Sequence, residues 1–295
     1  MKGTVGLLAS RIRLEEKRLL SAFAARAVRV EHVDPRKLRF QLTGAAPWPV
    51  VLNREISGTR ARYAALSLEA AGAVTLNPAR AIEVCGDKWA TSLALTRAGV
   101  PTPRATLALT PDAALEEIEA IGYPVVLKPL SSSWGRRVSL LRDPDAAQAV
   151  LEHCAALPAP QAHVIYLQAY VEKPGRDIRV VVVGDEVVGA VYRTADEWRT
   201  NVARGALTTP CDPQGELADT AIRAARAVGA QIAGVDLVED TDGRLMVIEV
   251  NSGVEFAGLQ QALGETCDVP GAIADLTRER LDVVLGGAAL AGAAS

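Results

Sequence analysis

The sequence predicts a mixed fold, α/β followed by α+β, organised as three regions along the chain. Strand-like and helix-like segments alternate in residues 1–86, a pattern typical of a parallel sheet covered by helices. Two apolar strands flank a Ser/Gly-rich loop in residues 87–171, and residues 172–285 contain two apolar hairpins. A chain of 295 residues is also long for a single core, which favours several regions.

The first region alternates strands and helices without a phosphate-binding glycine motif. Its helices have apolar residues three and four positions apart, and its strands are short apolar runs. We expect helices at 14–27 and 59–71 and strands at 4–9, 28–33, 49–52 and 73–76. Because no G-x-G-x-x-G loop follows a strand, nothing in this region indicates a dinucleotide.

The central region reads as a compact α+β unit. Gly99 and Gly122 each follow a helical pattern, as expected for residues that end helices. The Pro/Ala-rich stretch 157–162 predicts a hinge. We expect helices at 88–98, 113–120 and 145–154, strands at 124–130, 137–141 and 162–171, and a flexible loop at 131–135.

The third region is rich in strands. One hairpin is expected at 178–193 with its turn at Gly184–Asp185, and another at 232–250 with its turn at Asp240–Gly243. A helix at 216–229 separates them, and a last helix should run from Pro270 to about Leu285. The small residues of 286–295 predict a flexible tail.

Composition and charge exclude several function classes. The chain is 49% hydrophobic and 23% charged, as in folded globular proteins, and 32 Lys and Arg against 35 Asp and Glu give a net charge of −3. A mildly acidic chain is unsuited to coating nucleic acid or an anionic membrane. The four cysteines form no C-x-x-C pair, and no run reaches the roughly 20 apolar residues of a membrane span. The short apolar run at the start is no signal peptide, so we expect a cytoplasmic protein with reduced thiols.

Acidic residues in the final hairpin suggest a magnesium site. Glu249 and Asn251 are two positions apart on one strand, so they share a face, and Asp236 on the partner strand can join them. Two carboxylates and an amide oxygen suit Mg²⁺. The alternative is an ordinary solvated sheet face, but both acids interrupt apolar strands, where an unpaired carboxylate is costly.

Two lysines and a loop suggest a phosphate site. Lys128 ends an apolar strand just before the loop Ser131–Arg136, whose small residues allow backbone N–H groups to approach phosphate oxygens. Lys88 opens a helix, where a cation opposes the helix dipole unless it reaches an external anion. A pair of surface lysines beside a simple turn is the alternative, and no Walker A motif is present.

Arginines gather around the first hairpin of the third region. They are Arg176, Arg179, Arg193, Arg199 and Arg204. Guanidinium groups bind carboxylates and phosphates bidentately, although a solvated basic face is the alternative. Together with the acids and lysines, they suggest phosphoryl transfer from ATP to a carboxylate. The three histidines lie in none of these motifs.

In this order, the motifs resemble those of a known family. EVCGDKWAT, PVVLKP, SWGR, YVEKPGRDIRV, EWRTNVARG and IEVN resemble the ATP-grasp carboxylate–amine ligases of the RimK-like group. Within that group they are most similar to the LysX and ArgX ligases, which attach α-aminoadipate or glutamate to the carrier protein LysW. The resemblance covers about residues 5–285 and implies a three-region ATP-grasp architecture: a pre-ATP-grasp domain (1–86), a lid domain (87–171) and a C-terminal domain (172–285).

The resemblance implies a role for each matching residue. For ATP, these are Lys88 and Lys128 at the phosphates; Ser131, Ser132, Ser133, Trp134, Gly135 and Arg136 in the flap; Gln168, Ala169, Tyr170 and Val171 at adenine; and Asp177 at the ribose. Asp236, Glu249 and Asn251 match Mg²⁺ ligands, and Arg193, Asn201 and Arg204 match catalytic positions beside the transferred phosphate and acceptor carboxylate. Arg179, Ser252, Glu255 and Phe256 are the predicted substrate contacts.

The implied reaction is an ATP- and Mg²⁺-dependent ligation. ATP would phosphorylate the C-terminal glutamate side chain of a small acidic LysW-like carrier, and the α-amine of an amino acid would then attack the acyl phosphate. The resemblance also implies a homo-oligomer, dimer or tetramer. At the adenine-binding hinge, residues 168–170 read Gln-Ala-Tyr instead of the usual Gln-Glu-Tyr. Residues 252–258 also depart from the LysX-like pattern. Two alternatives are a RimK-type glutamate ligase with another acceptor and a non-catalytic nucleotide-binding module.

Overall fold

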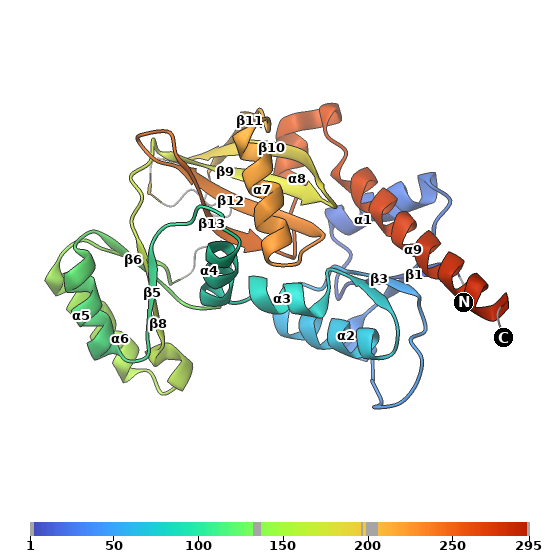
Figure 1. The fold of residues 1–295 in the computed structure, drawn as a ribbon, viewed down its shortest axis with the longest axis horizontal. Coiled ribbons are helices and arrows are strands. Elements are labelled where there is room, and N and C mark those ends of the chain that lie inside the picture. The colour runs from blue at the N-terminus through green and yellow to red at the C-terminus, as the bar shows by residue number, and fades with distance from the viewer. Residues whose placement is uncertain (1–2, 132–136, 196, 199–205, 294–295) are drawn as a thin grey trace.

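The protein contains a parallel N-terminal sheet and two antiparallel sheets, which confirms the predicted mixed fold class (Figure 1). The computed structural model describes residues 3–131, 137–195, 197–198 and 206–293, with side chains to residue 287. None of the helices in these ranges is long and apolar enough to cross a membrane.

The N-terminal sheet has the strand order β2-β1-β3-β4, and every pairing in it is parallel. Its elements are β1 (Thr4–Leu8), α1 (Leu14–Ala25), β2 (Arg29–Val33), β3 (Val50–Asn53), α2 (Gly58–Ala70), β4 (Val74–Leu76) and α3 (Ala79–Cys85), of which α3 was not predicted. From β1 the chain continues to β2 on one side of the sheet, and from β3 it continues to β4 on the other side. The carboxyl ends of these two strands therefore flank a switch point, where open α/β sheets bind ligands.

The central sheet is antiparallel, in the order β5-β8-β6-β7. The elements of this region are α4 (Lys88–Arg97), β5 (Ala105–Ala108), α5 (Pro111–Ile121), β6 (Val125–Lys128), β7 (Ser139–Leu141), α6 (Pro144–Ala156) and β8 (Ile165–Ala169). Helices α5 and α6 begin one or two residues before their predicted starts. Thr110 and Asp143 cap them, and each is followed by a proline, which suits the first helical turn.

The C-terminal sheet has the antiparallel order β11-β10-β9-β12-β13. Its elements are β9 (Arg176–Val183), β10 (Glu186–Thr194), β11 (Leu207–Cys211), α7 (Glu216–Ala227), β12 (Ile232–Glu239), β13 (Leu245–Asn251), α8 (Ala257–Leu263) and α9 (Val269–Ala293). Side chains alternate along β9. Val180 and Val182 pack with α7 on one face, whereas Val181 and Val183 pack with α9 on the other.

The end of α9 differs from the prediction. We expected this helix to end near Leu285, but it continues through the small residues to Ala293. Alanine and leucine are strong helix formers, so two adjacent glycines within the segment did not end the helix. In Figure 1, α9 lies beside α1 and brings the carboxyl terminus close to the amino terminus.

The hydrophobic cores divide the molecule unevenly. Leu7 and Leu52 of the N-terminal sheet share one buried cluster with Val181 and Ile273 of the C-terminal region. The central sheet and its two helices, α5 and α6, form a separate cluster around Ile118. The N- and C-terminal regions therefore form a continuous support, and the central unit projects from it (Figure 1).

Candidate active site

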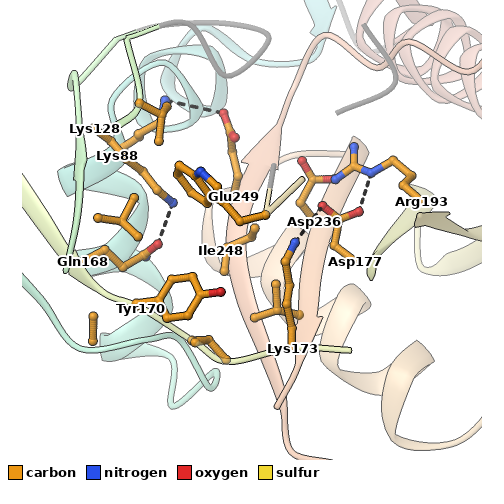
Figure 2. A pocket seen from close by; sticks show the side chains of 16 residues that line it. Lys88, Lys128, Gln168, Tyr170, Lys173, Asp177, Arg193, Asp236, Ile248 and Glu249 are labelled. Carbon is orange, nitrogen blue, oxygen red and sulfur yellow. Dashed lines mark hydrogen bonds and ion pairs between the residues drawn. The ribbon is translucent and has the colours of Figure 1, made fainter. Parts of the chain in front are cut away.

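A pocket lies between the central sheet and the C-terminal sheet, and it gathers residues from both (Figure 2). The residues predicted from the sequence that line it are Lys88, Lys128, Gln168, Ala169, Tyr170, Val171, Asp177, Arg193, Asp236 and Glu249. They are up to 161 positions apart in the chain (249 − 88). The fold thus brings the lysines, the hinge and the acids to one cavity.

The two lysines occupy one wall of this pocket. Lys88 is the first residue of α4, and its Nζ lies 3.6 Å from Glu249 Oε1. Lys128 ends β6, and its Nζ donates a hydrogen bond to Gln168 Oε1 at 2.6 Å. Burial lowers the pKa of Lys128 to about 8, with Lys88 adding to the effect and Glu249 opposing it. The residue is half-buried as a whole, but its ammonium group lies deep in the pocket.

The hinge Gln168–Val171 begins at the end of β8, and hydrogen bonds of the Gln168 side chain hold it in place. Gln168 Nε2 donates a hydrogen bond to Tyr166 Oη at 3.0 Å, and that hydroxyl lies 2.8 Å from Ser92 Oγ of α4. Gln168 is only 3% exposed. Its side chain therefore connects Lys128 to a buried polar chain, which fixes both the lysine and the hinge.

The acids meet across the last hairpin. The register of β12 and β13 places Asp236 opposite Glu249 and Gly234 opposite Asn251, with a bulge at Ile248. Asp236 is 4% exposed. Its Oδ1 lies 3.0 Å from Arg193 Nη2 and 3.1 Å from Arg179 Nε. These are ion-pair contacts, and this buried oxygen accepts no hydrogen bond from the described residues.

This arrangement fits Mg²⁺. The donors are all oxygens, and one of them is the buried Asp236 Oδ1 without a hydrogen bond. In the described ranges no group of three or more His, Cys, Asp or Glu side chains could hold a metal ion by itself. A pair of carboxylates is nevertheless typical for Mg²⁺, which completes its shell with water and substrate phosphate oxygens.

Arg193 lies between two carboxylates. Its Nε donates to Asp177 Oδ1 at 2.6 Å, and its side chain is 5% exposed. Although burial alone lowers its pKa, Asp236 and Asp177 raise the pKa above the ordinary arginine value. Lys173, which the sequence analysis missed, lies 4.0 Å from the other oxygen of Asp177. The motif YVEKPGRDIR contains this lysine four residues before Asp177, and that spacing could have indicated that the two side chains lie close together.

The variant Arg193→Met tests this charge cluster. We expect it to lower the free energy of unfolding by about 3–5 kcal/mol, since both carboxylates lose a buried partner. Urea unfolding measures the difference, with Arg244→Met as the control, because the exposed Arg244–Asp242 pair should contribute less than about 1 kcal/mol. Equal stability of the two variants would show that Arg193 does not balance the acids.

A second pocket lies at the carboxyl ends of β1 and β3, at the switch point of the N-terminal sheet. It is lined by Arg13, Arg54, Glu55, Arg179, Asp236, Glu249, Asn251, Ser252 and Glu255, among others. Asp236 and Glu249 line both pockets, so the two cavities meet at these carboxylates. The structure does not support Phe256 as a substrate contact, because this side chain is fully buried and packs under Arg54.

Among the described residues, the arginines of the first hairpin are paired with acids and do not form a free basic face. Arg176 pairs with Glu239 at 3.0 Å, and Arg179 and Arg193 pair with acids inside the pockets. The solvated alternative is therefore wrong for Arg193, which is buried. Arg199 lies outside the described residues.

Several predicted residues cannot be placed in the pockets. Ser131 lines an open groove that leads to Lys88, Glu249 and Asn251. The following predicted residues lie outside the described ranges: Ser132, Ser133, Trp134, Gly135, Arg136, Asn201 and Arg204.

Comparison with known proteins decides the family. Residues 85–275 match the family model of the RimK-like ATP-grasp domain, and residues 5–84 match that of the LysX preATP-grasp domain. The chain belongs to the RimK-like ATP-grasp family. It is therefore an ATP-dependent ligase that joins an acid to an amino acid, as the resemblance predicted.

Individual RimK-like proteins are similar over most of the chain. A glutamate–LysW ligase ArgX from Sulfurisphaera tokodaii is 34% identical, over 88% of this chain and 93% of its own. An α-aminoadipate–LysW ligase LysX from Saccharolobus solfataricus is 34% identical, over 70% of this chain and 75% of its own. The crystal structure of a RimK domain ATP-grasp protein from Sphaerobacter thermophilus superposes with a TM-score of 0.78 at 30% identity, covering 92% of this chain and 98% of that one.

Proposed function

We propose that this ligase joins the C-terminal glutamate side chain of a LysW-like carrier protein to the α-amine of glutamate, α-aminoadipate or a related amino acid. The ArgX and LysX relatives carry LysW in their names, which supports this partner. The observation that carries the proposal is the meeting of two pockets at Asp236 and Glu249. A reaction between a nucleotide and two further substrates requires such a junction.

In this proposal the first pocket binds ATP. Lys88 and Lys128 hold the phosphates, because two cations lie together on one wall. The backbone of Gln168–Val171 binds adenine beside Tyr170, and Asp177 binds the ribose. The residues of the flap, Ser131–Arg136, close over the phosphates and keep water from the reacting carboxylate.

Asp236, Glu249 and Asn251 are the proposed ligands of Mg²⁺. The metal supplies positive charge that offsets the negative charge of the phosphates during transfer. Arg179 and Arg193 lie beside Asp236, so they can stabilise charge that develops on the acceptor carboxylate and on the transferred phosphoryl group. Asn201 and Arg204 are proposed for the same task.

The proposed chemistry has two steps. The acceptor carboxylate oxygen attacks the terminal phosphorus of ATP, forming an acyl phosphate and releasing ADP. The neutral amine of the amino acid then attacks the acyl carbon and an amide forms, and hydrogen phosphate leaves with the original carboxylate oxygen and the proton that the amine loses. Attack by an already neutral amine needs little side-chain acid–base catalysis, and no histidine lines either pocket.

The remaining predictions belong to this proposal. We propose that the pre-ATP-grasp domain spans residues 1–86, the lid domain 87–171 and the C-terminal ATP-grasp domain 172–285, followed by the tail. We further propose that the enzyme works in the cytoplasm as a homo-oligomer. Size-exclusion chromatography with light scattering tests the oligomeric state.

Intact-mass spectrometry tests the proposed substrates. The enzyme is incubated with ATP, Mg²⁺, a LysW-like carrier and glutamate or α-aminoadipate in turn. We expect the carrier to gain the mass of one amino acid minus water, and we expect no gain for a carrier whose last residue is changed from glutamate to glutamine. A gain on that changed carrier, or no gain with any amino acid, would contradict the proposal.

A further inference from the structure

A buried group of charges joins the N-terminal region to the active site. Arg54 follows β3, and its side chain is 5% exposed. Its Nη2 lies 2.6 Å from Glu15 Oε2, and its Nε lies 3.1 Å from Glu16 Oε1, both on the first turn of α1. The side chains of Glu15 and Glu16 are 6% and 0% exposed. Charges this deeply buried are costly unless each finds partners, so their placement is closely constrained.

Arg54 and Glu15 also hold the chain that follows β13. Glu15 Oε1 accepts hydrogen bonds from the backbone N–H groups of Phe256 at 2.6 Å and Ala257 at 2.7 Å. Arg54 Nη1 donates to the carbonyl oxygen of Val254 at 2.6 Å. The guanidinium also lies over the Phe256 ring, 5.5 Å from its centre. Two side chains from the first 54 residues therefore hold the backbone at three positions, 254, 256 and 257.

The segment 252–257 that they hold forms a wall of the second pocket. Ser252, Gly253 and Glu255 line that pocket together with Asp236 and Glu249. The segment begins directly after Asn251, the last residue of β13. Its other end is the start of α8, where the first backbone N–H groups have no partner within the helix. The carboxylate of Glu15 accepts hydrogen bonds from them. A shift of the segment would therefore move the pocket wall relative to the carboxylates.

We propose that Arg54 and Glu15 are positioning residues, which act through segment 252–257 to place the wall of the second pocket against Asp236 and Glu249. Arg54 also lines the second pocket, but its guanidinium nitrogens contact Glu15, Glu16 and the carbonyl of Val254. This inference rests on the proposed function in one respect, namely that the second pocket receives the carboxylate and the amine. An acyl phosphate whose amine is misplaced is lost to water, so positioning governs the yield of product per ATP.

The chain offers a matched control for the test. Arg26, which directly follows α1, makes a bidentate pair with Asp275 of α9, both contacts at 2.8 Å. This pair also joins the N-terminal region to the C-terminal region, but neither residue lines the two pockets. A general loss of contact between these regions would therefore also appear in Arg26→Met.

The test compares Arg54→Met, Arg54→Lys and Arg26→Met in the full-length enzyme. Hydrogen exchange of the Phe256 and Ala257 amides is measured first, since it needs no substrate. We expect exchange to rise about tenfold in Arg54→Met and to stay unchanged in Arg26→Met. Arg54→Lys should recover only part of the protection, because one ammonium cannot reach three separate acceptors.

Steady-state kinetics then separates positioning from loss of fold. We expect kcat/KM for the amine to fall about 10–100-fold in Arg54→Met, with phosphate released per amide rising above one-to-one and the Kd for ADP unchanged. Where Arg54→Met does not fold, Glu15→Gln replaces it, since the neutral amide fills the same space but accepts hydrogen bonds from the two N–H groups more weakly than the carboxylate, so exchange should again rise.

Two results would overturn the inference. One is unchanged exchange at Phe256 and Ala257 in a folded Arg54→Met or Glu15→Gln enzyme. The other is equal loss of ADP affinity and amine kcat/KM, which is the result of a merely structural role. Failure of the wild-type enzyme to modify a LysW-like carrier would instead refute the proposed substrates, and the exchange measurement would still decide this inference.

Discussion

Glu249→Gln is expected to lower the ligation kcat about 10²–10³-fold while the protein stays folded. Glu249 lines both pockets and lies 3.6 Å from Lys88 Nζ. The amide keeps the size of the side chain but removes the charge that faces Lys88 and that we propose binds Mg²⁺. Product formation at saturating ATP is measured over a series of Mg²⁺ concentrations, and the variant should also need more Mg²⁺ for half-maximal activity.

Glu239→Gln is the matched control for this prediction. The Glu249 side chain is 30% exposed and that of Glu239 is 32% exposed, and each lies close to a basic side chain. Glu239 ends the strand that carries Asp236, but it lines neither pocket. We expect its variant to keep the wild-type kcat and Mg²⁺ dependence. An equal effect of both substitutions, or none at Glu249, would remove Glu249 from the proposed metal site.

Lys128→Met should weaken ATP binding and stabilise the fold at the same time. The loss of one charge-assisted contact to phosphate is expected to raise the Kd for ATP about 10–100-fold. The free energy of unfolding at pH 7 should rise by about 1–2 kcal/mol. Each pKa unit corresponds to about 1.4 kcal/mol, and the lost hydrogen bond to Gln168 offsets part of the gain. Isothermal titration and urea unfolding measure the two effects.

The contribution of Lys128 to the free energy of unfolding depends on pH. Burial lowers the pKa of Lys128 from 10.5 to about 8, so between these values the unfolded chain binds more protons than the folded chain. The contribution of Lys128 to stability therefore improves as pH rises from about 8 to 10.5, and Lys128→Met lacks that improvement. ATP should bind wild-type enzyme more weakly above pH 8. Lys37→Met, at an exposed lysine, should match wild type in every measurement. A less stable Lys128→Met with normal ATP affinity would contradict the assignment.

The sequence allowed much of the site to be predicted because the key contacts follow local patterns. A hairpin with Asp236 on one strand and Glu249 on the other could pair these two residues, and the register confirms that pairing. Lys88 and Lys128 were recognisable because each stands at an unusual place, the first turn of a helix and the end of an apolar strand. The order of the motifs then indicated the resemblance to RimK-like ligases, which the family comparison confirms.

Other features depend on contacts between distant segments, and no local pattern contains them. Glu15 and Glu16 look like the acidic first turn of an ordinary surface helix, but in the fold both are buried and pair with Arg54. Strands β5 and β11 are short edge strands that form only because β8 and β10 present free backbone groups to them. The burial of Phe256 likewise depends on the packing of the N-terminal region against the segment after β13.

Transfer of ¹⁸O from the acceptor carboxylate tests the central claim most directly. The C-terminal glutamate side chain of a LysW-like carrier is labelled with ¹⁸O, and the carrier is incubated with enzyme, ATP, Mg²⁺ and the amino acid. The proposed acyl phosphate predicts ADP as the nucleotide product and one ¹⁸O atom in each phosphate released with an amide bond. Release of AMP, or amide formation with unlabelled phosphate, would contradict the account.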